Sequence, residues 1–143
     1  MNDNQIEEIS TDFLALGRLK NLWLNGNRIA SVQNLRGCRL LVHLDLGRNR
    51  LHGAASEVAI TLDSLSMTTE ILTMHVVSQG LDALSNLEFL NLAGNELSSL
   101  GNLAHLTKLE ELNLSENKLM SLQGIMPPNL IVSSNHNQVQ VER

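Results

Sequence analysis

Histidine and cysteine are the side chains of this sequence best suited to nucleophilic or metal-ligating chemistry, and they are scattered. Cys38, the single cysteine, occupies a position that a leucine, Leu106, fills later in the chain, so we predict a buried core residue. No glycine-rich phosphate loop and no G-x-S-x-G elbow is present. The histidines lack the close spacing of a metal-binding pair; they are His43, His52, His75, His105 and His136. We therefore predict no catalytic, cofactor or metal site, and a protein that is not an enzyme.

Aromatic side chains suit a different chemistry, the recognition of another protein. The chain has only three of them, Trp23, Phe89 and Phe13. Trp23 and Phe89 are expected on the exposed face of a sheet, where aromatic rings are natural interface anchors. Two other readings are open for Trp23: it shields the N-terminal end of the fold, or it packs beside His43. Phe89 has its own alternative, packing against Ile131 or a neighbouring strand residue.

A repeated pattern, L-x-x-L-x-L-x-x-N-x-L, indicates the elements that must position these side chains. Four clear copies form two pairs, and the copies of each pair are 22 residues apart; they begin at Leu19, Leu41, Leu87 and Leu109. Between the pairs a worn copy has glutamate in place of asparagine; it consists of Leu62, Leu65, Met67, Glu70 and Leu72. Partial copies flank the set; they are Asn4, Ile6 and Ile9 at one end and Val132, Asn137 and Val139 at the other.

Each copy predicts a short strand followed by a turn and a return segment. Alternation along the strand places Leu22 and Leu24 inside and Trp23 outside. We expect the motif asparagine to satisfy backbone groups that the turn would otherwise leave buried and unpaired; these structural asparagines are Asn27, Asn49, Asn95 and Asn117. Leucines then recur every three residues, which favours a short helical or 3₁₀ segment; one run is Leu97, Leu100, Leu103, Leu106 and Leu109.

The segments LKNLWLNGNRIASVQNLRG and LEELNLSENKLMSLQGI resemble the leucine-rich-repeat family, in its 22-residue intracellular class. That family includes a leucine-rich regulatory subunit of protein phosphatase 1 and an axonemal dynein light chain. The resemblance implies an α/β fold, a solenoid with a curved parallel β-sheet on its concave face and short helical or 3₁₀ segments on its convex face. We expect one domain, residues 1–143, of about six to seven coils.

In this family the usual binding surface is the concave face, so the resemblance implies contact through the outward strand residues. We expect them to hold a helix or loop of a partner protein in the groove. Two positions per repeat supply this surface; the predicted partner-binding residues are Asn21, Trp23, His43, Asp45, Ser64, Ser66, Phe89, Asn91, Glu111 and Asn113.

Charge is distributed unevenly along the chain. Residues 1–52 hold seven Lys/Arg and five Asp/Glu, whereas residues 53–143 hold three and ten. An acidic second half argues against nucleic acid lying along the whole surface, although a local basic patch is open around Lys20, Arg28, Arg48 and Arg50. Acidic residues also gather on consecutive repeats, either to attract a basic helix or loop or as a solvated face; they are Glu88, Glu110, Glu111 and Glu116.

Features of a secreted or membrane protein are missing from the sequence. The N-terminus has no basic region followed by an apolar run, and no stretch of about 18 apolar residues occurs. One cysteine cannot form an internal disulfide, so a reducing compartment fits best. We expect a protein of the cytoplasm or nucleus that is not secreted and not in a membrane, with a cytoskeletal or axonemal location also open.

Two regions depart from the regular pattern. Residues 53–80 form an irregular coil, read either as neutral drift or as a change on the binding face. Neither end carries a clear polar cap, since Ser134 stands where a core leucine belongs. Three readings of the ends are open: a fragment of a longer chain, a subunit whose ends a partner covers, or a poorly defined gene product.

The sequence thus favours an intracellular protein–protein interaction module, an adaptor or a regulatory subunit. A second class is a structural subunit of a large assembly, such as an axoneme or a ribonucleoprotein. A third class is the substrate-recognition part of a larger enzyme.

Overall fold

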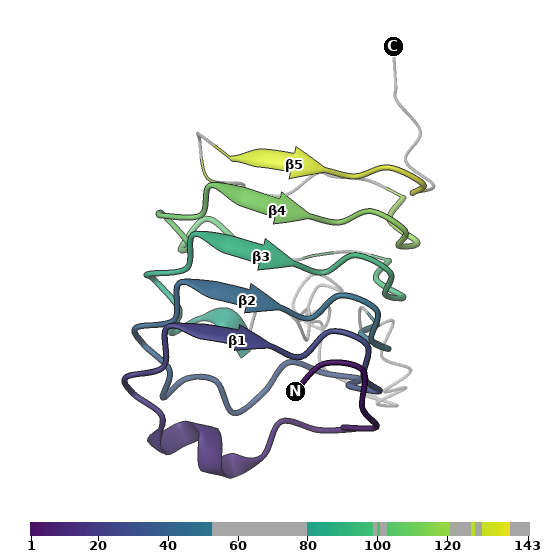
Figure 1. Ribbon diagram of the computed structural model, residues 1–143. Coiled ribbons are helices and arrows are strands. Elements are labelled where there is room, and N and C mark those ends of the chain that lie inside the picture. The colour runs from purple at the N-terminus through teal and green to yellow at the C-terminus, as the bar shows by residue number, and fades with distance from the viewer. Residues whose placement is uncertain (53–79, 99, 101–102, 121–126, 128–129, 138–143) are drawn as a thin grey trace, which may run out of the picture.

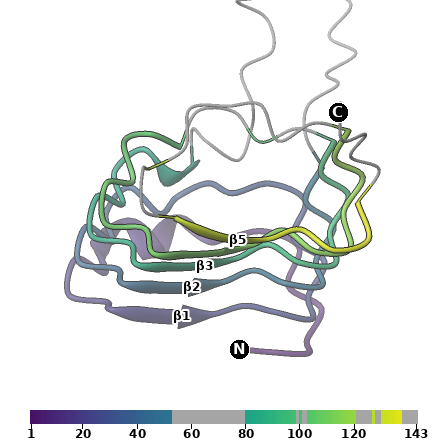
Figure 2. The same cartoon turned by 90° about the horizontal axis from the view of Figure 1, so that it is seen from above.

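Five short strands stack into one parallel sheet that forms one wall of a solenoid (Figure 1). The computed structural model describes residues 1–52, 80–98, 100, 103–120, 127 and 130–137. The strands follow one another in chain order across the sheet; they are β1 (Asn21–Trp23), β2 (His43–Asp45), β3 (Phe89–Asn91), β4 (Glu111–Asn113) and β5 (Ile131–Ser133). Seen from above, the strands lie on one side of the coils and the return segments on the other (Figure 2).

The middle residue of each strand points into the core, as the alternation predicts. These residues are in register, so that each pairs with the equivalent residue of the next strand. In the first four strands the middle leucine is at most 6% exposed; the four are Leu22, Leu44, Leu90 and Leu112. The fifth position holds Val132, which is 36% exposed. The core is therefore a column of leucines between the sheet and the return segments.

The return segments follow the three-residue spacing of their leucines. Cys38 N–H donates to the Leu35 carbonyl, and Leu41 N–H donates to the Cys38 carbonyl. The same bonds recur in later coils, for instance from Leu106 to Leu103. Bonds over three residues are the 3₁₀ pattern, which turns apolar side chains at every third position to one side. A longer 3₁₀ segment precedes β1 as the helix η1 (Thr11–Ala15).

The motif asparagines form a ladder of hydrogen bonds between coils, as predicted. Asn95 Nδ2 donates to the carbonyls of Leu92 in its own coil, at 2.9 Å, and of Leu46 in the coil before, at 3.0 Å. Its Oδ1 accepts from Leu51 N–H at 2.9 Å. All four predicted structural asparagines are buried and bonded in this way, with Met1 supplying the outer carbonyl for Asn27. One amide thus satisfies groups from two neighbouring coils.

The described sheet lacks a strand that the sequence predicts between the two pairs of clear repeats. The worn copy at Leu62 was expected to add a coil, and with it a strand, between the two pairs of clear repeats. Instead β2 pairs directly with β3, so Leu44 lies beside Leu90 although 46 residues separate them. Elsewhere Leu22 and Leu44, 22 residues apart, are neighbours in the same way.

The separation of paired residues is therefore 24 residues longer between β2 and β3 than between β1 and β2, and no strand of the described sheet stands between β2 and β3. His52 forms a bridge with Glu96, and Gly80 lies against Val32. Residues 53–79, with the worn copy, lie outside the described residues. Leucine spacing predicted a coil there, and in the described sheet β2 and β3 are joined directly by hydrogen bonds.

The described residues of both partial copies take part in the fold, and Val139 lies outside the described residues. At the N-terminal end Ile9 is 2% exposed, and Ile6 N–H donates to Asn27 Oδ1. At the other end Asn137 continues the ladder by donating to the Leu114 carbonyl at 2.8 Å. In the part of the chain that the structure describes, no helix combines the length and apolarity needed to span a membrane.

The residue before each motif asparagine has a left-handed backbone. Gly26 and Gly94 have φ values of +66° and +65°, which glycine adopts without strain. The equivalent residues in other coils are Arg48, Glu116 and His136, with φ between +52° and +59°. The turn thus imposes this conformation on every coil, whatever the residue type.

Candidate protein-binding face

The outward residues of the five strands form two columns on the concave face. The register aligns Asn21, His43, Phe89 and Glu111 in the first column, and Ile131 of β5 extends it. The second column consists of Trp23, Asp45, Asn91 and Asn113, extended by Ser133. Eight of the ten predicted contact residues are therefore brought together on one face. The other two, Ser64 and Ser66, lie outside the described residues.

Trp23 is the most exposed aromatic side chain of this face. It is 52% exposed, and its neighbour in register is Asp45 rather than His43. The described residues give its indole N–H no hydrogen-bond acceptor, so the ring edge meets solvent. An aromatic ring that is half exposed on a rigid strand is suited to stacking against a partner.

Phe89 packs against a residue of the same face, the histidine of the preceding strand β2. The rings of His43 and Phe89 lie 5.9 Å apart between centroids, with an angle of 32° between their planes. Of the two packing alternatives, the neighbouring strand residue is the one observed, because Glu111 separates Phe89 from Ile131 in the register. The pair makes a continuous aromatic area across β2 and β3.

The polar side chains of the second column are held by hydrogen bonds to the backbone. Asp45 Oδ1 accepts from Gly47 N–H at 3.0 Å, and Asn91 Oδ1 accepts from Ala93 N–H at 3.0 Å. Asn113 makes the equivalent bond with Ser115 N–H at 3.1 Å. Each side chain thus bonds to the residue two positions on, which restricts its rotamers before any partner arrives.

A polar hollow lies beside this column, where the strands end. Its volume is about 340 Å³, and Asp45, Asn91 and Asn113 contribute to its lining together with Arg48 and Glu116. Asn91 Nδ2 donates to Asp45 Oδ1 at 2.9 Å across the two strands. The hollow therefore presents charged groups of both signs and a row of fixed hydrogen-bonding groups.

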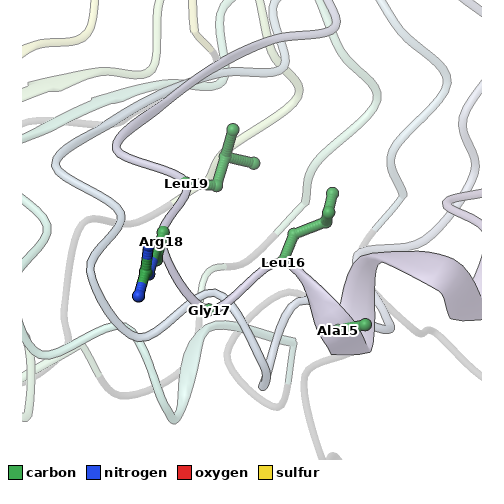
Figure 3. A pocket seen from close by; sticks show the side chains of 5 residues that line it. All are labelled: Ala15, Leu16, Gly17, Arg18 and Leu19. Atoms are coloured by element: carbon green, nitrogen blue, oxygen red, sulfur yellow. The ribbon is translucent and has the colours of Figure 1, made fainter.

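A second hollow lies at the corner after η1, away from the concave columns (Figure 3). It is lined by residues 15–19, and Leu16 and Leu19 project to one side of the chain while Arg18 projects to another. Leu16 is 42% exposed. The lining contains no acid or nucleophile, so this hollow suggests no chemistry.

Three of the four acidic residues of consecutive repeats are close in space. Glu110 N–H and Glu111 N–H both donate to the Glu88 carbonyl, which places these residues on adjacent coils at one rim of the sheet. Glu116 lies at the other end of its strand, in the lining of the polar hollow. All four side chains are exposed. Among the described residues the only salt bridge joins Lys118 and Glu96, at 2.8 Å, so these four carboxylates have no internal counter-ion.

Cys38 is fully buried, as predicted for a core position. Its Sγ lies 3.3 Å from the Phe13 carbonyl, to which the thiol donates, and burial raises the pKa of the thiol. A thiol that is buried and neutral is a poor nucleophile. Within the described ranges no three His, Cys, Asp or Glu side chains gather as a metal site would require.

Sequence reasoning missed two kinds of residue on this face. Ile131 and Ser133 continue the columns, and Ile131 is 68% exposed. The partial repeat at Val132 was the signal that could have found them. The backbone N–H groups of Gly47, Ala93 and Ser115, which hold the second column, carry no side-chain signal.

Comparison with known proteins agrees with the repeat fold. The family described as Leucine Rich repeats (2 copies) matches residues 85–125. No curated protein matches the chain at a significant level. Residues 85–125 are therefore leucine-rich repeats, and the parallel sheet and the asparagine ladder extend the leucine-rich-repeat fold to the other described coils.

Solved structures share the fold at low sequence identity. An internalin from Listeria monocytogenes superposes with a TM-score of 0.68 and 22% identity, over 98% of this chain and 35% of that one. The leucine-rich-repeat ectodomain of the receptor kinase SOBIR1 from Arabidopsis thaliana gives 0.60 and 24%, over 97% and 68%. The LRIM1/APL1C complex gives 0.55 and 20%, over 98% and 31%. This chain therefore spans about a third of the internalin and of the LRIM1/APL1C chain.

Proposed function

We propose that this leucine-rich-repeat chain is an intracellular adaptor or regulatory subunit that binds a helix or loop of a partner protein on its concave face. Leucine-rich-repeat folds generally serve as protein–protein interaction modules, and one structural relative, LRIM1/APL1C, is itself a complex. The observation that carries the proposal is Trp23, a half-exposed indole on strand β1. Residues of this kind contribute a large share of binding energy at protein interfaces.

The rest of the face supports this role. The His43–Phe89 pair adds a second aromatic area, and the bonds of Asp45, Asn91 and Asn113 to the backbone fix a polar column beside it. A preformed surface loses little side-chain freedom on binding, which raises affinity for a given contact area. The inner leucines hold the strands in register, so they position the surface without contacting the partner.

The test is affinity purification of the chain from the source cell, with mass spectrometry of the retained proteins. Wild type is compared with the double variant Trp23→Ala/Phe89→Ala. We expect at least one abundant partner to be retained by wild type and reduced about tenfold or more in the variant, since interface aromatics contribute more than about 1.4 kcal/mol each.

The matched control is Leu40→Ala, which removes an apolar side chain that is 46% exposed and lies outside the two columns. It should retain the partner at the wild-type level. Equal retention by all three proteins would contradict concave-face binding and favour a structural subunit of a large assembly, held through other faces. If a longer transcript encodes this chain fused to an enzyme, that result would favour the substrate-recognition role.

A further inference from the structure

Asp45 is a carboxylate on the concave face that the described residues leave without a counter-ion. Its Oδ1 is fixed by Gly47 N–H at 3.0 Å and by Asn91 Nδ2 at 2.9 Å. No hydrogen bond from the described residues reaches Oδ2. Arg48 lines the same hollow, but it forms no salt bridge with Asp45 in the described part of the chain. The carboxylate is thus oriented, half-buried and open to an external cation.

Trp23 lies on the strand beside Asp45, at the same level of the sheet. The two residues are partners in the parallel register of β1 and β2, and both point outward from the sheet. Neighbouring strands lie about 4.8 Å apart, so the two side chains leave the sheet close enough for one planar group to reach both. The ring is 52% exposed, which leaves a face free for stacking.

From this juxtaposition we propose that the face binds an arginine side chain of the partner, with the guanidinium stacked on the Trp23 indole and hydrogen-bonded to the Asp45 carboxylate. Guanidinium is planar, so it can stack on an aromatic ring while its N–H edge faces a carboxylate. Lysine carries a compact, strongly hydrated ammonium, which matches this pair of groups less well. An anionic group of the partner would be repelled by the negative charge of Asp45. This inference rests on the proposed function and names the partner chemistry of the same face.

The test uses the fluorescence of Trp23, which is the only tryptophan of the chain and therefore reports on this site alone. Three peptides are titrated into the wild-type protein: acetyl-Gly-Arg-Gly-amide and its lysine and citrulline counterparts. Citrulline keeps the shape of arginine without its charge. We expect a saturable change with the arginine peptide, with a Kd on the order of 1 mM for so small a ligand. Binding should be about fivefold weaker with lysine, and no saturation should occur with citrulline.

The variant Asp45→Asn removes the charge and retains the Trp23 signal. It should weaken the arginine peptide about fivefold to tenfold, because an ion pair at a partly exposed site contributes modestly. The matched control Asp82→Asn changes an exposed carboxylate in a return segment and should bind as wild type does. Thermal melts check that both variants are folded. If Asp45→Asn fails to fold, the citrulline comparison on wild type still decides.

Equal binding of the arginine and citrulline peptides, or of wild type and folded Asp45→Asn, would overturn the proposal. Asp45→Asn is also introduced into the affinity purification. Loss of the partner in both Trp23→Ala/Phe89→Ala and Asp45→Asn supports the arginine site. Loss in the aromatic variant alone, without peptide discrimination, overturns the arginine site but leaves concave-face binding intact. Retention in both variants contradicts the proposed function itself.

Discussion

The inward and outward positions of the same strands show how differently neighbouring residues are constrained. On β3 the inward Leu90 is fully buried, whereas Phe89 and Asn91 on either side are partly exposed. The inward position is leucine in four strands and valine in the fifth. The outward positions change from strand to strand in size, charge and aromaticity. Packing fixes the first set, and the second is free to carry recognition.

The largest expected effect comes from breaking the inward row. Leu90→Ala should lower the free energy of unfolding by about 2 to 5 kcal/mol, because it leaves a cavity between two coils. Phe89→Ala, on the same strand, should lower it by less than about 1 kcal/mol, since its ring is partly solvated. Urea denaturation measures both. Equal losses would show that the aromatic pair with His43 is part of the stability core rather than a free surface.

A smaller loss of stability is expected from replacing either of two asparagines of one coil, and the two losses should differ. Asn95→Ala should cost about 1 to 3 kcal/mol, since its buried amide bonds to the Leu46 and Leu92 carbonyls and to Leu51 N–H. Asn91→Ala should cost about 0.5 to 1 kcal/mol, because its partners keep access to water. Thermal or urea unfolding of the two variants decides. A larger loss for Asn91 would contradict the assignment of the ladder as the structural element.

The smallest effect concerns the exposed ion pair of the turn region. Hydrogen bonding and charge from Lys118 hold the pKa of Glu96 below its ordinary value near 4.5. The stabilisation that this ion pair gives is therefore complete at pH values above the ordinary pKa. It is lost as the pH falls through the lowered pKa of Glu96. Lys118→Gln should return the pKa of Glu96 toward its ordinary value in an NMR titration.

Lys108→Gln is the control for that titration. Lys108 Nζ donates to Asn86 Oδ1 rather than to a carboxylate, so this variant should leave the pKa of Glu96 unchanged. An unchanged pKa in Lys118→Gln would mean that Arg50 and His52, which also lower it, dominate.

The sequence was sufficient for the features that the described coils share. The recurring leucines predicted the strands, their inward faces and the three-residue spacing of the return segments, because each coil can bury its apolar edge only against a similar coil. The motif asparagines predicted the ladder, since a buried turn leaves backbone groups that need one amide each. The two outward columns followed from alternation along the strand.

Only the tertiary structure decided which repeats are neighbours and what the outward residues do. A leucine pattern is local, so it predicted a strand at the worn copy without telling which strands pair, while the pairing of β2 with β3 depends on hydrogen bonds between residues 46 apart. The His43–Phe89 contact and the Asn91–Asp45 bond are consequences of that pairing. Side chains far apart in sequence become one surface only when the backbone register brings their strands together.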